Sequence, residues 1–150
     1  MARALWRLYR AHHGPGIDGA GGTFAEGRWH SLGRRVAYFG ASAAIVVLER
    51  LAHTDPDLLP SDLRLALFEL PDRADSLITL NDLPGNWVRT ERWTQITGDD
   101  WLRSKASCLL AVPSAILPEE TNYVFNPDHP DARKLRLVRE RPFSFDPRLI

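Results

Sequence analysis

Proline ends two of the main apolar segments of this chain. Leu63–Leu70 is followed directly by Pro71, and the apolar segment 107–112 is followed by Pro113. Proline has no backbone N–H to donate, and its ring clashes with the preceding helical turn, so it stops both helices and inner strands. Apolar segments of this length between such stops are typical of strands. The chain is therefore expected to build on a sheet of short strands.

The remaining pattern completes an α+β domain. Alternating or short apolar runs predict further strands at 4–9, 36–39, 77–80, 122–125 and 135–139, and a short strand or extended arm at 23–30. A helix is predicted over 43–52, capped by Ser42, and another over 99–105. The length of 150 residues suits one domain, 1–150, of six or seven strands with two or three helices.

Composition excludes several classes of protein. Lys+Arg and Asp+Glu number 19 each, and each half of the chain is balanced, which argues against direct nucleic-acid binding. The longest apolar run, Ala43–Leu48, is far shorter than the roughly 20 residues of a membrane span. The N-terminal residues lack the apolar stretch of a signal peptide, so a cytoplasmic protein is expected. The single cysteine, Cys108, allows no intramolecular disulfide and is expected in the core.

The common motifs of metal and phosphate sites are absent from the sequence. The histidines show no helical ligand spacing, so no metal site is expected; they are His12, His13, His30, His53 and His129. The glycine-rich segment Gly14–Gly22 is not followed by Gly-Lys-Ser/Thr and is not a Walker loop. It is predicted to be a mobile surface loop, and the sequence assigns it no role.

Several polar side chains stand at the ends of apolar elements, where a site is commonly built. These side chains are Arg28, Tyr38, Glu49, Ser114, Asn122 and Asn126. Most of them also have a structural explanation. Arg28 could pair with Glu26, Tyr38 could be a core residue, and Glu49 could be exposed to solvent. Ser114 and the segment 126–128 could simply form turns. Spacing alone does not choose between the two kinds of explanation.

Two blocks of residues, in order along essentially the whole chain, resemble RES-domain proteins. The first block contains Gly27-Arg28-Trp29-His30-Ser31-x-Gly33, Val36-Ala37-Tyr38, and Ser42-Ala43-Ala44 through Leu48-Glu49. The second contains Val112-Pro113-Ser114-Ala115, Glu120-x-Asn122, and Asn126-Pro127-x-His129-Pro130. The Arg, Glu and Ser that name the family correspond to Arg28, Glu49 and Ser114. His30 stands where the family usually has Asn, and Ala25 and Glu26 replace part of its usual Gly-Gly run.

The resemblance implies a fold like that of ADP-ribosyltransferase toxins, with mixed or antiparallel short strands. It further implies the toxin of a bacterial Xre–RES toxin–antitoxin pair, which depletes NAD⁺ by cleaving the nicotinamide–ribose bond. NAD⁺ would be a substrate, and no cofactor is expected. The implied protein partner is an Xre-type antitoxin that blocks the site with its C-terminal segment, and the complex allows a homodimer. DNA contact would belong to that partner.

The resemblance also assigns roles to residues. Arg28 would clamp the pyrophosphate or ribose, and Tyr38 would hold the nicotinamide ring flat. Glu49 would stabilise positive charge developing on the ribose, and Ser114 would orient the site by hydrogen bonding. His30 and Asn122 would complete the NAD⁺-binding set, and the effects of His30 and Glu26 on activity stay open.

Other activities stay open at this point. The acceptor of the ribosyl group is water, phosphate or a protein side chain, and the last of these would make the chain a protein ADP-ribosyltransferase toxin. A small ribonuclease toxin using His30, His53 or His129 is a less favoured alternative. An inactive antitoxin-binding module is another, since the five tryptophans suit an interface.

Overall fold

A single mixed sheet organises the chain, which a computed structural model describes over residues 1–73 and 75–150. Within these residues the sheet has seven strands, in the order β4-β5-β6-β2-β1-β3-β7. The strands are β1 (Ala2–Arg10), β2 (Ala37–Gly40), β3 (Leu63–Pro71), β4 (Leu77–Thr79), β5 (Leu109–Pro113), β6 (Thr121–Phe125) and β7 (Arg136–Pro142). Neighbouring strands are antiparallel except β4 and β5, which are parallel. The predicted mixed sheet of short strands is confirmed.

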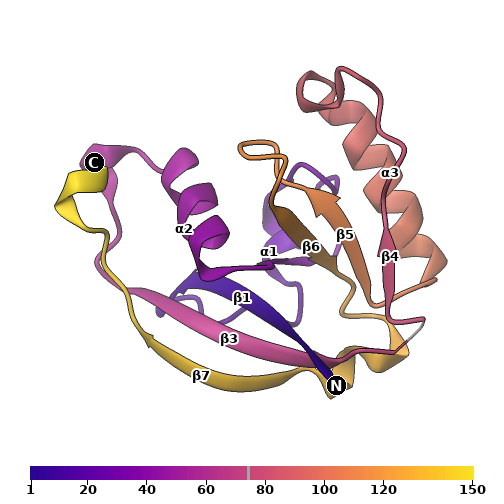
Figure 1. Cartoon of the computed structure of the whole chain (residues 1–150), viewed down its shortest axis with the longest axis horizontal. Helices are drawn as coiled ribbons and strands as arrows, with labels where there is room; N and C mark the ends of the chain where they lie inside the picture. The colour runs from indigo at the N-terminus through magenta and orange to yellow at the C-terminus, as the bar shows by residue number, and fades with distance from the viewer. Residues whose placement is uncertain (74) are drawn as a thin grey trace.

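Three α-helices accompany the sheet in the described residues: α1 (Gly21–Phe24), α2 (Ala43–Ala52) and α3 (Glu91–Ser104). Short 3-10 turns occur at Pro56–Leu58, Trp87–Arg89, Pro130–Lys134 and Pro147–Leu149. In Figure 1, α2 lies above β1 and β3, whereas α3 lies beside β5 and β4. The fold is therefore α+β, as predicted. No helix in the described part of the chain is long and apolar enough to cross a membrane.

The start of α2 matches the prediction. The Ser42 Oγ accepts a hydrogen bond of 3.2 Å from the backbone N of Ile45, which satisfies one of the free N–H groups of the first turn. Gly40 ends β2 two residues before this cap. A Cβ at Gly40 would lie 2.6 Å from side-chain atoms of Ile45 and Val46. The absence of a side chain thus lets α2 pack closely against the end of β2.

Two groups of buried side chains pack on the sheet. One contains Phe39, Phe68 and Phe125, whose rings meet edge to face with centroids 5.5 and 5.6 Å apart around Phe39. The other joins β5 and β6 to Trp29 and to Trp101 of α3. Because successive residues of a strand point to opposite faces, Tyr38 and Phe39 contribute to different groups.

Three local predictions are wrong. The helix predicted over 99–105 begins at Glu91. The buried residues of its first half are Thr94 and Gly98, not the apolar residues that make a helix recognisable. Residues 23–30 form no strand: they contain the end of α1 and an isolated bridge from Gly27 to His30.

The glycine-rich segment also differs from its prediction as a surface loop. Gly19 and Gly22 are buried, and a Cβ on either would lie within 2.6 Å of backbone atoms of residues 34–36. The Pro15 carbonyl accepts a 2.6 Å hydrogen bond from Arg7 Nε. This segment is therefore packed against the sheet and the chain that precedes β2.

Candidate functional site

Glu49 on α2 is held by two side chains from the sheet. Ser114 Oγ donates to Glu49 Oε1 at 2.6 Å, and Asn122 Nδ2 donates to the same oxygen at 3.2 Å. His53, one helical turn further on, has its Nε2 3.7 Å from Glu49 Oε2. Three elements far apart in sequence, α2, β6 and the end of β5, thus meet at one carboxylate. The alternative of a freely solvated Glu49 is wrong.

Ser114 serves the turn after β5 as well as Glu49. Its Oγ accepts from the backbone N atoms of Ile116 and Leu117 at 3.1 and 3.2 Å, so the turn explanation for this residue also holds. Those two N–H groups occupy the acceptor side of the hydroxyl and leave its proton for Glu49. The side chain is completely buried, so the direction of this hydrogen bond is determined by protein groups alone.

Tyr38, His30 and the backbone of Trp29 form a second group. Tyr38 Oη lies 2.7 Å from His30 Nδ1 and accepts from the Trp29 N at 3.2 Å. His30 Nε2 lies 2.8 Å from the Ala25 carbonyl oxygen, which can only accept, so Nε2 carries the proton. His30 Nδ1 is then the acceptor for the Tyr38 hydroxyl. Burial raises the pKa of that hydroxyl well above 10, so Tyr38 remains a neutral donor.

Arg28 is half-buried beside this second group. Its Nη1 donates to the Val88 carbonyl at 3.1 Å, and its guanidinium carbon lies 5.8 Å from the centre of the Trp87 ring. The guanidinium is thus directed toward the Trp87–Arg89 turn rather than toward Glu26, which is exposed. Among the described residues the guanidinium makes one hydrogen bond and is partly exposed to solvent, so an anionic ligand could replace that bond at a small cost in free energy.

Strand pairing relates the two groups. Tyr38 pairs with Val124, and Gly40 pairs with Asn122, so Tyr38 and Asn122 project from the same face of neighbouring strands. Such diagonal neighbours lie about 7–8 Å apart. In the described residues no hydrogen bond joins the two groups. The structure therefore brings Glu49, Ser114 and Asn122 into direct contact. It places Tyr38, with its partner His30, on the same sheet face as Asn122, whereas the Arg28 side chain contacts Val88 and Trp87.

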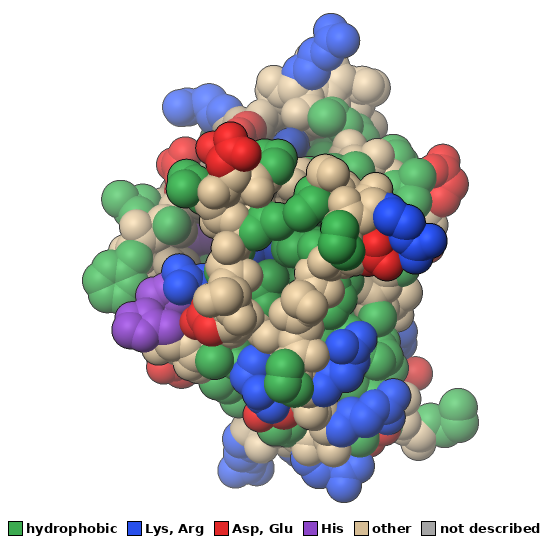
Figure 2. All heavy atoms as spheres, turned by 90° about the vertical axis from the view of Figure 1, so that its left-hand side faces the viewer, with side chains coloured by type: hydrophobic (Ala, Val, Ile, Leu, Met, Phe, Trp, Pro, Cys, Tyr) green, Lys and Arg blue, Asp and Glu red, His purple; other side chains and the backbone are tan. Residues whose placement is uncertain are grey.

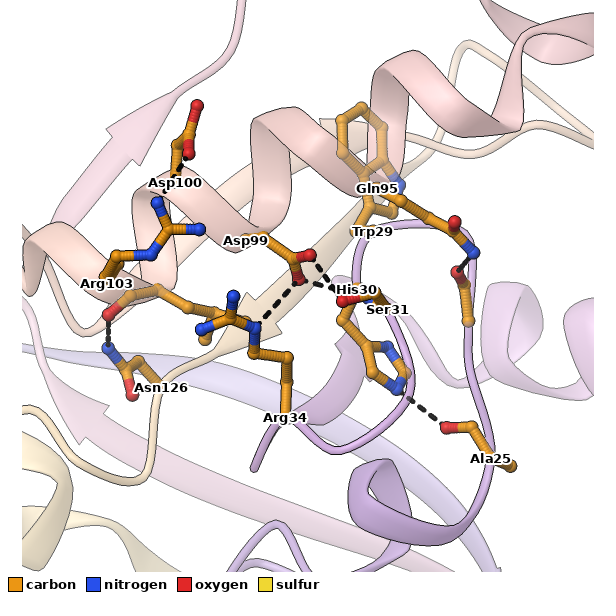
Figure 3. A network of polar contacts seen from close by, with 12 residues as sticks. Ala25, Trp29, His30, Ser31, Arg34, Gln95, Asp99, Asp100, Arg103 and Asn126 are labelled. Atoms are coloured by element: carbon orange, nitrogen blue, oxygen red, sulfur yellow. Dashed lines mark hydrogen bonds and ion pairs between the residues drawn. The ribbon is translucent and has the colours of Figure 1, made fainter.

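Sequence reasoning missed the residues that hold the segment 27–31. They lie on α3 and are Thr94, Gln95, Gly98 and Asp99. Figure 3 shows Gln95 and Asp99 pointing toward this segment. Buried polar and small residues at helical spacing were the available signal, but without the full extent of α3 the spacing was not apparent. Asn126, the remaining polar candidate, is structural: its Nδ2 donates to the Leu102 carbonyl at 3.0 Å.

Metal ligands do not gather in the described residues. No group of three or more His, Cys, Asp or Glu side chains there is arranged to hold an ion. A surface hollow of about 310 Å³ lies between Asp62, Arg64 and Phe143, and the predicted site residues do not line it. The chemistry available at the site is that of one oriented carboxylate, one arginine and a half-buried tyrosine.

Comparison with known proteins places this chain in a family. The sequence pattern of the RES domain matches residues 4–146. "Toxin Res" of Pseudomonas putida is 39% identical over 147 residues, covering 97% of this chain and 98% of the relative. "Prs ADP-ribosylating toxin" of a Sphingobium species is 34% identical over 158 residues, covering 100% of this chain and 98% of the relative.

A solved structure shares the fold. It is that of the M. tuberculosis MbcT–MbcA toxin–antitoxin complex, with a TM-score of 0.74 over 96% of this chain and 85% of that chain. The sequence identity is 18%, so this likeness concerns the fold alone. The pattern match and the identity of the full-length relatives are sufficient for assignment. The chain belongs to the RES domain family.

Proposed function

We propose that this chain is the toxin of a toxin–antitoxin pair and that it cleaves the nicotinamide–ribose bond of NAD⁺. The names of its relatives, "Toxin Res" and "Prs ADP-ribosylating toxin", support the toxin role. ADP-ribosyl transfer from NAD⁺ begins with cleavage of that same bond. The observation that carries the proposal is the Glu49 carboxylate, which Ser114 and Asn122 hold in one orientation.

The reaction needs charge stabilisation more than proton transfer. As the bond breaks, its electron pair neutralises the nicotinamide ring, and positive charge develops on the ribose. A carboxylate oriented before the reaction stabilises that charge without having to reorganise. Two donors occupy Glu49 Oε1, so Oε2, which has the His53 Nε2 3.7 Å away, would be the oxygen that faces the substrate. The acceptor oxygen then bonds to the ribose carbon and loses its proton.

Arg28 and Tyr38 would bind the substrate. The Arg28 guanidinium matches the geometry of a pyrophosphate oxygen pair, which replaces the single bond to the Val88 carbonyl. The Tyr38 hydroxyl is committed to His30 and Trp29, so the ring is held in place and its face is the part left for the nicotinamide. His30 is buried with both ring nitrogens bonded and therefore positions Tyr38 rather than exchanging protons with a substrate.

Two further aspects belong to the proposal. The acceptor is a protein side chain, water or phosphate; the name of the Sphingobium relative favours a protein acceptor. The protein partner is an antitoxin of the Xre type that covers the site with its C-terminal segment. The presence of a toxin–antitoxin complex among structures with this fold supports a partner of this kind.

The test uses the full chain made by cell-free synthesis, because a chain that consumes NAD⁺ would harm a producing cell. It is incubated with NAD⁺ alone, with phosphate, or with bacterial lysate protein, and nicotinamide and the ADP-ribosyl product are measured. Glu49→Gln should reduce nicotinamide release at least about a hundredfold. Glu119→Gln, which changes an exposed carboxylate near the same turn, should not. No NAD⁺ loss with the wild-type chain, or unchanged loss with Glu49→Gln, would refute the proposal.

A further inference from the structure

The backbone of the segment 27–31 is held mainly by one helix. Gln95 Nε2 donates to the Gly27 carbonyl at 2.9 Å, and Thr94 Oγ1 donates to the Arg28 carbonyl at 2.6 Å. Asp99 Oδ1 accepts from the Ser31 N at 3.0 Å. A sheet would normally satisfy such groups with backbone partners, but here side chains of α3 do so. The position of this segment therefore depends on α3.

Asp99 is a buried carboxylate in the middle of this contact. Its exposed fraction is 8%, and it accepts from both the backbone N and the Oγ of Ser31, the latter at 2.6 Å. Arg34 Nε lies 3.7 Å from the same carboxylate (Figure 3). A buried charge is tolerated only where such partners are in place, so Asp99 holds Ser31 in one geometry.

Close approach completes the contact. A Cβ on Gly98 would lie 1.7 Å from the Trp29 carbonyl oxygen, so the helix backbone touches the segment at this point. Thr94 and Gly98 are four residues apart, as are Gln95 and Asp99, so the two pairs form adjacent rows along α3. Thr94 is completely buried; its single hydroxyl proton points to the nearer Arg28 carbonyl, and the Glu91 carbonyl oxygen lies 2.9 Å from the same Oγ1. These contacts leave the backbone at Arg28 little freedom to move.

We infer that Thr94 and Asp99 are positioning residues for substrate binding, acting through Arg28. The inference rests on the proposed function, because it is the binding of NAD⁺ phosphates that requires Arg28 to be held. The direction in which a guanidinium can reach is determined by its own backbone, and Thr94 bonds to the carbonyl of that residue. Loss of the hydroxyl lets the segment move and reduces the fraction of chains ready to bind.

The first test compares Thr94→Val with Thr94→Ser. Valine keeps the shape but removes the donor, whereas serine keeps the donor. Thr94→Val should raise the KM for NAD⁺ about tenfold with a smaller change in kcat, and Thr94→Ser should restore most of the loss. In an Arg28→Ala background, Thr94→Val should cause no further rise in KM. An equal rise in that background would show that Thr94 does not act through Arg28.

The second test compares neighbouring aspartates on α3. Asp99→Asn removes the charge that Ser31 and Arg34 contact, whereas Asp100→Asn removes an exposed charge that pairs with Arg103 at 3.1 Å (Figure 3). Asp99→Asn should raise the KM for NAD⁺ and Asp100→Asn should leave it unchanged. Thermal unfolding of each variant confirms that folded protein is compared.

An NMR measurement distinguishes a failure of the proposed function from a failure of the inference that α3 positions Arg28. In ¹⁵N-labelled protein, Thr94→Val and Asp99→Asn should shift the Arg28 Nε–H and Trp29 amide signals, while Asp100→Asn should not. If the wild-type chain consumes no NAD⁺ but these signals shift, the proposed function fails and the positioning by α3 stands. If the chain is active and neither the signals nor KM respond, the positioning inference is overturned.

Discussion

Ser114 shows how one hydroxyl can serve both a turn and a site. It accepts two backbone N–H groups of the turn and donates to Glu49 Oε1. The turn therefore determines the orientation of the hydroxyl, and the hydroxyl determines that of the carboxylate. At the scale of single residues, structural and chemical roles coincide rather than compete.

Ser114→Ala should lower both stability and activity. It leaves two turn N–H groups and one carboxylate oxygen without this partner, so the free energy of unfolding should fall by about 1–3 kcal/mol. Urea unfolding measures this change, and nicotinamide release measures the accompanying loss of activity. Ser144→Ala, at an exposed serine, should change the free energy of unfolding by less than about 0.5 kcal/mol. Equal stability of the two variants would contradict the account of Ser114.

Cys108 gives a prediction about pH. Burial, the main cause, raises the pKa of its thiol from 9.0 to about 12. Above pH 9 the unfolded chain loses this proton while the folded chain keeps it, so this contribution to stability falls as pH rises from 9 toward 12. Urea unfolding between pH 8 and pH 10 should show a steeper loss for wild type than for Cys108→Ala. Identical slopes would show that the thiol does not ionise differently in the two states.

At the scale of elements, α2 is joined to the sheet at both ends. Near its start, Ser42 Oγ accepts from the Ile45 N and donates to Glu120 Oε1 at 2.9 Å. Further along the helix, Glu49 is held by Ser114 and Asn122. The Ser114 N in turn donates to the Glu120 carbonyl at 2.9 Å, so one turn contacts both regions of the helix.

Substitutions at Ser42 should separate capping from the link to Glu120. Ser42→Ala loses both contacts and should cost about 1–2 kcal/mol of unfolding free energy. Asn and Asp cap helices about equally well, but Asp would place a negative charge beside Glu120. Ser42→Asp should therefore be less stable than Ser42→Asn, by an amount that shrinks at high salt. Equal stability of these two variants, measured by thermal unfolding, would argue against the link.

At the scale of the whole molecule, β7 leaves one edge of the sheet open. All seven of its residues are exposed, Leu137 and Val138 among them, and three of the others are arginines. Figure 1 places β7 along the bottom of the molecule, and Figure 2 shows basic side chains gathered at the lower end of the side that it presents. Charged side chains on an edge strand discourage pairing with another chain.

Arg139→Val should promote self-association of the protein through the edge strand β7. It removes a charge next to exposed apolar residues, so self-association should begin at a lower protein concentration than in wild type. Light scattering coupled to size exclusion measures the change. Arg148→Val, which removes an exposed charge from outside the sheet, is the control. Equal behaviour of the two variants would show that the edge does not depend on this charge.

The sequence by itself determined the local structure and the family. The alternating strands, the cap at Ser42 with its helix, and the two blocks of RES-like residues follow from neighbours in the chain, so they were predicted without the fold. The start of α3 was not, because its buried face is polar where it meets the segment 27–31.

Only the tertiary structure decided how the site is assembled. Ser114 and Glu49 are 65 residues apart, and Asp99 and Ser31 are 68 apart. Such contacts depend on which strands pair and on how closely the helices approach the sheet and the segment 27–31, and sequence periodicity carries no information on either. The residue types of the site could therefore be predicted from the sequence. Their orientation came from long-range packing, because a buried polar group takes its direction from whichever partners the fold brings within reach.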